Sequence, residues 1–479
     1  MPNKPAPGGV PADRPPGGVP NSPPPVDLSS SRRIHVVGVG GAGMSAIASV
    51  LAAMGHQVSG SDLKGSPVTD RLAAQGVVVS VGHRADQVDG ADLVTFSPAV
   101  GPTNVELAEA VRRGIPVARR AEVLAAVAAT RRCLAVAGTH GKTTTSSMLS
   151  LILVQAGRRP SFLIGADVNE IGTNAVWDDG EWMVLEADES YGTFTALAPE
   201  VAVVTNVEPD HLDHYGTFDA LLAAFSDFLA AASGAKVVCA DDDVAAELGR
   251  AAGAVSVGTS PVADYRMTDV VQRRSAVGFD LTGPGGRLGR LEVSVPGIHN
   301  ARNAAVATVA ALSVGVPFDA AVAALARFAG VPRRFEFRGE ANGVTFVDDY
   351  AHLPTEVQAA LATARSGGWR RIVAVFQPHR YTRTAALAPT FGDAFAGADL
   401  LVVTDVFSAG EPPVPGVSGK LVADAVAAGG REMPVIYAPT RDELRDIVTA
   451  VLSPGDLCLT LGAGDLTTLP DELLAAPGW

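Results

Sequence analysis

The sequence is poor in cysteine and in positive charge. Its three cysteines, Cys133, Cys239 and Cys458, stand far apart in apolar surroundings. Because zinc sites and disulfide frameworks need clustered cysteines, this spacing indicates buried free thiols in a reducing compartment. The net charge of −14 argues against non-specific binding to nucleic acid, which uses a basic stripe. We therefore expect neither a zinc centre nor a nucleic-acid partner.

Long apolar runs are also lacking. No stretch approaches the roughly 20 apolar residues that cross a membrane, and the N-terminus lacks the apolar core of a signal peptide. We expect a cytoplasmic protein without a membrane partner. Its 479 residues exceed what one core organises and suggest about three domains. Residues 1–30 are dense in proline and glycine and have almost nothing to bury, which predicts a disordered tail.

The most informative stretch lies at residues 134–148. Residues 134–137 predict a buried parallel strand and residues 146–155 a helix, and between them lie Gly138, Thr139, His140, Gly141, Lys142, Thr143 and Thr144. A strand, a glycine turn and a helix start make a cradle for phosphate, because backbone N–H groups and the helix dipole attract an anion. We interpret residues 138–144 as an ATP loop, in which Lys142 meets the terminal phosphates and Thr143 can hold Mg²⁺. Val136 occupies the place where the usual spacing has glycine, so the loop is a shortened variant.

An earlier glycine turn follows a strand over 34–37 and precedes a helix over 44–54. Gly38, Gly40 and Gly43 satisfy the dinucleotide fingerprint, and Asp62 lies where a ribose-binding acid would. The pattern indicates a phosphorylated nucleotide, of which NAD is one candidate.

Acidic clusters follow two strands of the middle region. The strand over 182–185 ends in Glu186-Ala187-Asp188-Glu189, and the strand over 201–205 leads to Glu208-Pro209-Asp210-His211. Ligands bind at the carboxyl ends of parallel strands, and Mg²⁺ prefers carboxylate oxygens, so we favour a metal role over a solvated turn. Residues 235–291 read as irregular, with β-hairpins. His299 and Asn303 open an Ala/Val-rich helix, where they could simply be caps.

Strands and helices alternate again from about residue 331. Expected strands cover 344–347, 372–376, 400–404, 435–437 and 457–461, and expected helices cover 355–365, 385–396, 418–428 and 440–452. Polar residues again follow the strands, and Arg380 and Arg383 suit bidentate capture of a carboxylate or phosphate. We predict an α/β protein with a disordered tail and three domains: residues 31–130, Rossmann-like; 131–331, a central P-loop ATPase-type parallel sheet; and 332–479, Rossmann-like.

Seven motifs in this order resemble the Mur ligases of peptidoglycan synthesis, and within them the alanine-adding branch. They are residues 38–45, 138–144, 186–190, 208–211, 299–303, 348–352 and 376–383. The resemblance implies ATP and Mg²⁺ as cofactors and UDP-N-acetylmuramate and L-alanine as substrates. ATP would phosphorylate the lactyl carboxylate, and the amine of alanine would attack the acyl phosphate. A monomer or weak homodimer is expected.

The resemblance also implies roles for individual residues. Gly38, Gly40, Gly41, Gly43, Met44, Ser45 and Asp62 would bind the UDP part of the substrate. The ATP loop with His299, Asn303 and Arg334 would bind ATP, and Thr143, Glu186 and His211 would hold metal. Tyr350, His352, Arg380 and Arg383 would shape the amino-acid site. Catalytic roles are expected for Lys142, Glu186, His211 and His352.

Two features bear on the branch. Sibling ligases carry a carbamylated lysine after the motif that matches Asp210-His211, whereas this chain has no lysine between Lys142 and Lys236, which fits the alanine-adding branch. Against it, Leu353 replaces the second His of a His-His-Pro motif. A tripeptide-recycling ligase of the same family, an NAD-dependent oxidoreductase and a non-catalytic nucleotide-binding module remain as alternatives.

Overall fold

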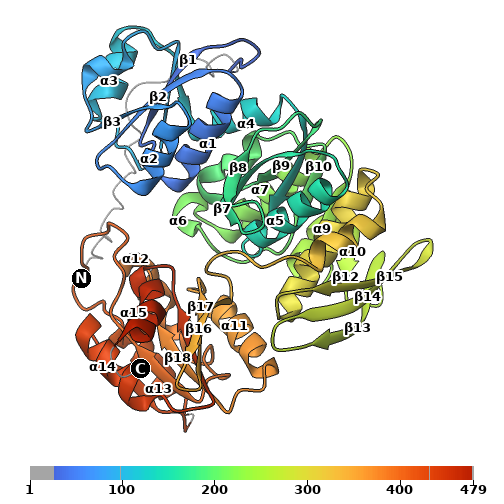
Figure 1. Ribbon diagram of the computed structural model, residues 1–479, viewed down its shortest axis with the longest axis vertical. Coiled ribbons are helices and arrows are strands. Elements are labelled where there is room, and N and C mark those ends of the chain that lie inside the picture. Colours follow the sequence, from blue (N-terminus) through green and yellow to red (C-terminus); the bar gives the residue numbers. More distant parts are fainter. Residues whose placement is uncertain (1–25, 98, 431, 477–479) are drawn as a thin grey trace, which may run out of the picture.

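Three β-sheets follow one another along the chain, and each forms the centre of one lobe (Figure 1). The computed structural model describes residues 26–97, 99–430 and 432–476. Most neighbouring strands run parallel, with helices between them, so the predicted α/β class is confirmed. None of the helices in these described ranges is long and apolar enough to cross a membrane. All three cysteines are buried and free.

The first lobe has a five-stranded parallel sheet with the order β3-β2-β1-β4-β5. Its strands are β1 (Arg33–Val37), β2 (Gln57–Asp62), β3 (Val78–Val81), β4 (Leu93–Phe96) and β5 (Val117–Arg119), and its helices are α1 (Ala42–Ala53), α2 (Pro67–Ala74), α3 (Val105–Arg112) and α4 (Arg120–Ala128). A short 3₁₀ turn covers Ala85–Val88. The order changes direction at β1, so the glycine turn after β1 lies at the switch point where such sheets bind ligands.

The expected disorder over residues 1–30 is wrong for its last part. Leu28 is only 7% exposed and packs in the apolar core beside α4, and Val26 packs against the same cluster. These two apolar side chains pack against the first lobe, although the surrounding composition is typical of disorder. Residues 1–25 lie outside the described residues.

The middle lobe is built on a ten-stranded sheet with the order β15-β14-β13-β12-β11-β10-β6-β9-β7-β8. Its strands are β6 (Arg132–Ala137), β7 (Ser161–Val168), β8 (Thr173–Val176), β9 (Trp182–Glu186), β10 (Val201–Val204), β11 (Lys236–Cys239), β12 (Val255–Gly258), β13 (Tyr265–Gln272), β14 (Val277–Gly283) and β15 (Gly286–Val293). Its helices are α5 (Lys142–Gln155), α6 (Leu212–Tyr215), α7 (Phe218–Ala230), α8 (Asp243–Ala252), α9 (Ile298–Ser313) and α10 (Phe318–Leu325), and a 3₁₀ helix covers Ser190–Ala196. Helices α5 and α9 are buried along most of their length, which explains why neither has a polar stripe.

The hairpins expected within 235–291 are confirmed, because β13, β14 and β15 form an antiparallel meander. The irregular structure expected before them is wrong, since β11, α8 and β12 extend the parallel sheet. Gly249 explains part of the error. It resembles a helix breaker, but it is a packing position: a Cβ there would stand 2.4 Å from a methyl of Val238.

The third lobe has a six-stranded sheet with the order β16-β17-β21-β18-β19-β20. Its strands are β16 (Glu336–Ala341), β17 (Val344–Asp349), β18 (Arg371–Phe376), β19 (Leu400–Val403), β20 (Val435–Tyr437) and β21 (Asp456–Leu461). Its helices are α11 (Pro354–Ser366), α12 (Tyr381–Leu387), α13 (Lys420–Ala428), α14 (Arg441–Val451) and α15 (Leu469–Ala475), with 3₁₀ turns at Ala388–Phe391 and Asp465–Thr468. The helix expected over 385–396 is wrong. Helix α12 ends at Leu387, and Pro389, which cannot donate a backbone hydrogen bond, lies in the 3₁₀ turn that follows.

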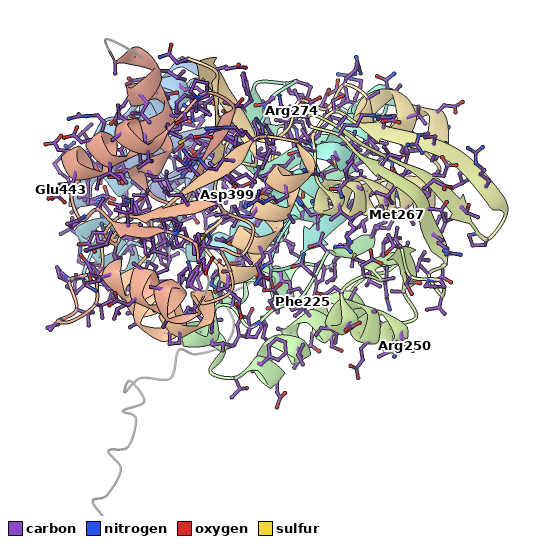
Figure 2. The ribbon with its side chains drawn as sticks, turned by 90° about the horizontal axis from the view of Figure 1, so that it is seen from below. Phe225, Arg250, Met267, Arg274, Asp399 and Glu443 are labelled. Carbon is purple, nitrogen blue, oxygen red and sulfur yellow. The ribbon has the colours of Figure 1, made fainter. Side chains whose placement is uncertain are left out.

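The third lobe also contacts the middle lobe away from the strand ends. Arg274, on the turn between β13 and β14, donates through Nε to the carbonyl of Gly367 (2.9 Å). Its guanidinium lies 4.6 Å from the ring centroid of Trp369. Figure 2 shows Arg274 where the two lobes meet. This contact fixes one edge of the third lobe on the middle lobe.

Candidate active site

The ATP loop joins β6 to α5 as predicted, and its two glycines have positive φ. A Cβ on Gly138 would stand 2.1 Å from Oγ1 of Thr205, and one on Gly141 would stand 2.7 Å from Oδ1 of Asn303. Only glycine therefore fits at either place. Neighbouring side chains fix the loop further: the backbone N–H of His140 donates to Asn206 Oδ1 (2.8 Å), and Thr205 Oγ1 donates to the carbonyl of His140 (2.6 Å).

Lys142 begins α5 and folds back over the loop. Its Nζ donates to the carbonyl of Gly138 (2.6 Å) and lies 2.8 Å from Oε2 of Glu189. Burial lowers the pKa of Lys142, but the carboxylates of Glu189 and Asp188 outweigh it and the net pKa is raised. Lys142 therefore stays protonated where the loop would present phosphate.

The three expected metal ligands fall into two groups. Thr143 Oγ1 donates to Glu186 Oε1 (3.0 Å), and the N–H of Gly165 donates to Glu186 Oε2 (2.6 Å). His211 instead lies with its Nε2 3.9 Å from Glu189 and 3.6 Å from Asp210. Ligand atoms of Asp188, Glu189 and His211 all lie within 4.8 Å of one another. Hard oxygen donors and an imidazole fit a divalent cation such as Mg²⁺.

Glu186 and His211 each have an unusual property that is typical of functional sites. Burial raises the pKa of Glu186, although Lys142 and the N–H of Gly165 oppose the shift, so a further cation beside this carboxylate would stabilise its charged form. His211 has φ 54°, in the left-handed region that non-glycine residues rarely occupy. Strain of this kind persists where the surrounding structure fixes a functional side chain.

An inner cavity of about 250 Å³ lies beside the ATP loop. Its lining includes His140, Thr205, Glu208, Cys239, Asp241, His299, Asn300, Asn303, Arg334 and Glu356. The structure thus brings His299, Asn303 and Arg334 to the ATP loop. Burial, with smaller contributions from Arg334 and Arg302, lowers the pKa of His299 to about 4, and its Nδ1 has no hydrogen-bond partner within the described residues. A neutral, unsatisfied imidazole suits a flat heterocycle with polar edges.

A larger interlobe cavity of about 560 Å³ opens between the middle and third lobes. Its lining brings together Lys142, Thr143, Glu186, Asp188, His211, Tyr350, His352, His379, Arg380 and Arg383. All four expected amino-acid-site residues therefore face the same space as the ATP loop. Arg333 and Arg334 lie against Tyr350, with guanidinium carbons 4.8 and 5.0 Å from the ring centroid.

The two arginines differ in their partners. Arg383 reaches across the cavity, with NH2 3.3 Å from Oδ1 of Asp210 in the middle lobe. Arg380 stays within the third lobe, where its Nε donates to Oε1 of Glu411 (2.6 Å). Arg380 also has a positive φ of 67°. Burial opposes ionisation of Glu411, but hydrogen bonds from Thr382 and Arg380 lower its pKa to about 2.

The glycine turn of the first lobe is arranged as an anion site. The N–H of Gly40 donates to Asp62 Oδ2 (2.8 Å), so the carboxylate of Asp62 is committed to the turn. A Cβ on Gly43 would stand 2.7 Å from the guanidinium carbon of Arg120, whose Nε is buried without a hydrogen-bond partner in the described part of the chain. A cation at the N-terminus of α1 is unfavourable unless an anion binds between them.

The other residues expected at this turn have different surroundings. Met44 is 2% exposed and packs in the core, so its side chain is not available to a ligand. Ser45 lines a cavity of about 210 Å³ between α1 and the β7–β8 hairpin. Gly165 lines both this cavity and the interlobe cavity. The two cavities therefore adjoin at Gly165.

Three Mur ligase family models match consecutive parts of the chain: the Mur ligase family catalytic domain over residues 33–132, the middle domain over 136–311, and the glutamate ligase domain over 333–464. A UDP-N-acetylmuramate–L-alanine ligase of Pelotomaculum thermopropionicum is 44% identical over 93% of this chain and 98% of its own. The chain belongs to the Mur ligase family.

Other relatives agree with this assignment. A UDP-N-acetylmuramate–L-alanine ligase of Saccharopolyspora erythraea is 47% identical to this Mur ligase over 92% of the chain and 93% of its own. The crystal structure of a UDP-N-acetylmuramate–alanine ligase from Thermotoga maritima superposes with a TM-score of 0.78 at 29% identity, covering 92% of this chain and 98% of that one. The expected family is confirmed.

Sequence reasoning missed several residues at the site of this Mur ligase. No individual role was assigned from sequence to Glu356, Glu411, His379 or Arg120. Burial, His352 and the nearby arginines lower the pKa of His379 to about 4, so its ring is neutral beside them. Arg120 and Glu411 could be found only by folding the chain, because their partners lie 77 and 31 positions away.

Proposed function

We propose that this Mur ligase joins L-alanine to the lactyl carboxylate of UDP-N-acetylmuramate, with ATP converted to ADP and phosphate. One observation carries the proposal: the interlobe cavity holds a phosphate loop, an acidic cluster and two arginines around one space. The 44–47% identical relatives named above support the choice of alanine over a tripeptide. We place the reaction in the cytoplasm, on a monomer or weak homodimer.

The chemistry explains why these parts lie together. A carboxylate is a poor acyl donor, so an oxygen of the lactyl carboxylate first attacks the γ-phosphorus of ATP and ADP leaves. The alanine amine then attacks the acyl carbon, a tetrahedral intermediate forms, and phosphate leaves with the oxygen that linked it to carbon. Negative charge builds on the transferring phosphoryl group, and the protonated Lys142 supplies preorganised opposite charge.

Residues of the middle lobe would hold ATP and Mg²⁺. Thr143 and Glu186 form one oxygen-donor pair, and Asp188, Glu189 and His211 form a second group. Bound Mg²⁺ would neutralise phosphate charge and orient the phosphoryl group. His299, Asn303 and Arg334 line the inner cavity, where we place the adenine.

The third lobe would supply the amino-acid site. A guanidinium fork can hold a carboxylate in one plane, and Arg383 already donates one hydrogen bond through NH2 to the carboxylate of Asp210 (3.3 Å). Burial and the nearby arginines lower the pKa of His352, although Glu356 opposes the shift. Its Nδ1 faces the carbonyl of Tyr350 at 3.1 Å, which places the proton of the neutral ring there and leaves Nε2 as an acceptor. We assign His352 to accept the proton of the alanine amine.

The first lobe would hold the UDP group. Gly38, Gly40, Gly41 and Gly43 present the turn, and Arg120 would meet the diphosphate at the N-terminus of α1. Asp62 would act by holding the turn in shape. The position of the third lobe over the ATP loop would keep water from the acyl phosphate.

The test is ADP release by the purified full chain, with Mg²⁺, ATP and UDP-N-acetylmuramate, and with L-alanine or the tripeptide as acceptor. We expect release that needs both UDP-N-acetylmuramate and alanine and that stops when Mg²⁺ is chelated. Release with the tripeptide alone would favour the recycling ligase. ATP binding without ADP release would favour a non-catalytic module, and nicotinamide absorbance changes with NAD would favour an oxidoreductase.

A further inference from the structure

Glu356 lines both the inner cavity beside the ATP loop and the interlobe cavity, and the proposed reaction gives it no role. It is the third residue of α11, and its side chain is 10% exposed. Its Oε2 accepts hydrogen bonds from the backbone N–H groups of His352 (2.9 Å) and Leu353 (3.1 Å). Its Oε1 faces His140 of the ATP loop, 3.1 Å from Nδ1.

A capping role explains only half of these contacts. Glutamate at the third position of a helix commonly accepts from the backbone N–H of the cap residue, and Oε2 does this. Oε1 instead crosses to another lobe, to a residue 216 positions earlier. A helix cap has no need of that second contact.

The contact between Glu356 and His140 belongs to a network of hydrogen bonds and ion pairs between the middle and third lobes. His140 Nε2 lies 3.3 Å from Oε2 of Glu208, and the same oxygen accepts from Thr355 Oγ1 (2.7 Å). Thr355 is the neighbour of Glu356 in the first turn of α11. The imidazole of His140 is thus held between a carboxylate of its own lobe and one of the third lobe.

The electrostatics agree with an ionised Glu356. Burial alone would raise its pKa, but the imidazoles of His352 and His140 and the guanidinium of Arg334 lower it well below the usual range. Both of its oxygens therefore act as acceptors. One oxygen is committed to the loop that would hold ATP, and the other to the segment that carries His352.

We propose that Glu356 is a positioning residue of the ligase reaction. Through its contact with His140, it fixes the position of His352 and the amino-acid site relative to the ATP loop. This inference rests on the proposed function, which assigns His352 to the alanine amine and the ATP loop to the phosphates of ATP. When the ATP loop is ordered, it holds His140 in place. His140 then fixes the side chain of Glu356, and Glu356 fixes the backbone of His352 and Leu353.

The decisive variant is Glu356→Gln. Glutamine keeps an oxygen that can cap His352 and Leu353, so α11 retains its start. Its NH₂ group then faces Nδ1 of His140, where a protonated imidazole also donates, and the contact between residue 356 and His140 is lost. The matched control is Glu443→Gln, which changes the third residue of α14 on the outer surface (Figure 2).

Steady-state kinetics supply the first readout. For Glu356→Gln we expect the KM for alanine to rise about tenfold, as typical coupling energies imply. The KM for UDP-N-acetylmuramate should stay unchanged, because the first lobe binds that substrate. Glu443→Gln should match the wild type. An unchanged alanine KM in a folded Glu356→Gln protein would reduce Glu356 to a cap and overturn the inference.

A double-mutant cycle tests the route. His140→Asn alone should also raise the alanine KM, and the double variant should be no worse than the more impaired single variant, because each change removes the same contact. Additive effects would overturn the inference, since His140 and Glu356 would then act separately.

Hydrogen exchange gives a readout that does not depend on alanine as the substrate. Adding Mg²⁺ and a non-hydrolysable ATP analogue should slow exchange of the amides over 350–357 in the wild type, and several-fold less in Glu356→Gln. Equal protection in both proteins would contradict the inference. Failure of the wild type to release ADP with alanine would contradict the proposed function and leave this comparison intact.

Discussion

Lys142 shows how a cation is kept charged in a buried site. Its partner Glu189 is only 2% exposed and lies 2.8 Å from its ammonium group. We expect Lys142→Ala to lower the turnover number at least about a hundredfold, because developing phosphoryl charge loses its stabilising partner. The measurement is ADP release at saturating substrates.

The pairing of Lys142 with Glu189 also affects the expected stability of a Lys142 variant. Lys142→Ala leaves the buried carboxylate of Glu189 without its ammonium partner, which costs about 3–5 kcal/mol when no water reaches it. We therefore expect this substitution to lower the free energy of unfolding as well as the turnover. The double variant Lys142→Ala/Glu189→Gln should recover much of the melting temperature without recovering turnover. Full activity in a folded Lys142→Ala protein would remove the ATP loop from the mechanism.

Arg383 is the residue we expect to hold the alanine carboxylate. Arg383→Ala should lower kcat/KM for alanine about a hundredfold, because a buried charged contact is worth about 2–5 kcal/mol, and ATP binding should be spared. Arg365→Ala is the control, since Arg365 also pairs with an aspartate, Asp399 (2.9 Å), on the outside of the same lobe. Intact alanine kinetics with weakened nucleotide binding would mean that Arg383 serves phosphate.

His140 makes a pH dependence predictable. Burial lowers its pKa, but Glu208 and Glu356 outweigh burial and raise it to about 9, from an ordinary value of 6.5. A raised pKa means that its ion pairs stabilise the fold fully below pH 6.5, and that this contribution is lost as pH rises through about 9. Melting curves of wild type and His140→Gln should therefore differ most near pH 6 and converge by about pH 10. A difference that is independent of pH would show that His140 carries no charge in the folded protein.

At the scale of elements, the segment over residues 26–30 provides a direct test of packing. Leu28→Ala should reduce the free energy of unfolding by about 2 kcal/mol, the lower end for a leucine truncated in a core. Val262→Ala is the control, because Val262 is 88% exposed. Urea denaturation midpoints give the comparison, and equal midpoints would mean that residue 28 contributes nothing to the core.

Elements with a clear apolar period were predictable from sequence, and elements defined by long-range pairing were not. Strands β6, β9, β10 and β18 are apolar runs followed by polar clusters, so both their presence and the side of the sheet that holds the site followed from the pattern. Strand β16 is largely polar and exists because it pairs with β17. Helix α8 is amphipathic, but Gly249 near its end resembles a helix breaker.

The residues of the candidate site also fall into those that the sequence pattern predicts and those that depend on contacts between lobes. The ATP loop, the acidic cluster that begins at Glu186 and the two arginines follow apolar strands, and their position in the sequence singled them out, whereas His352 was assigned a role through the family resemblance. Glu356 gave no such signal, because a glutamate in the first turn of a helix is ordinary. Its second contact exists only because the third lobe stands on the middle lobe, which local sequence does not encode.

At the scale of the whole molecule, the proposed reaction is divided among the three lobes. The glycine turn of the first lobe, the ATP loop of the middle lobe and the arginines of the third lobe all follow the carboxyl ends of parallel strands. The interlobe cavity is where the last two meet. In this account, the arrangement exists so that an activated carboxylate forms in the middle and is captured by an amine from one side.

Isotope transfer tests that account most directly. UDP-N-acetylmuramate labelled with oxygen-18 in both oxygens of the lactyl carboxylate is converted with ATP and L-alanine, and the released phosphate is analysed by mass spectrometry. An acyl phosphate predicts one labelled oxygen in each phosphate, one retained in the amide and none in ADP. Unlabelled phosphate, or label in AMP, would show that the carboxylate is not activated by the γ-phosphoryl group and would contradict the account.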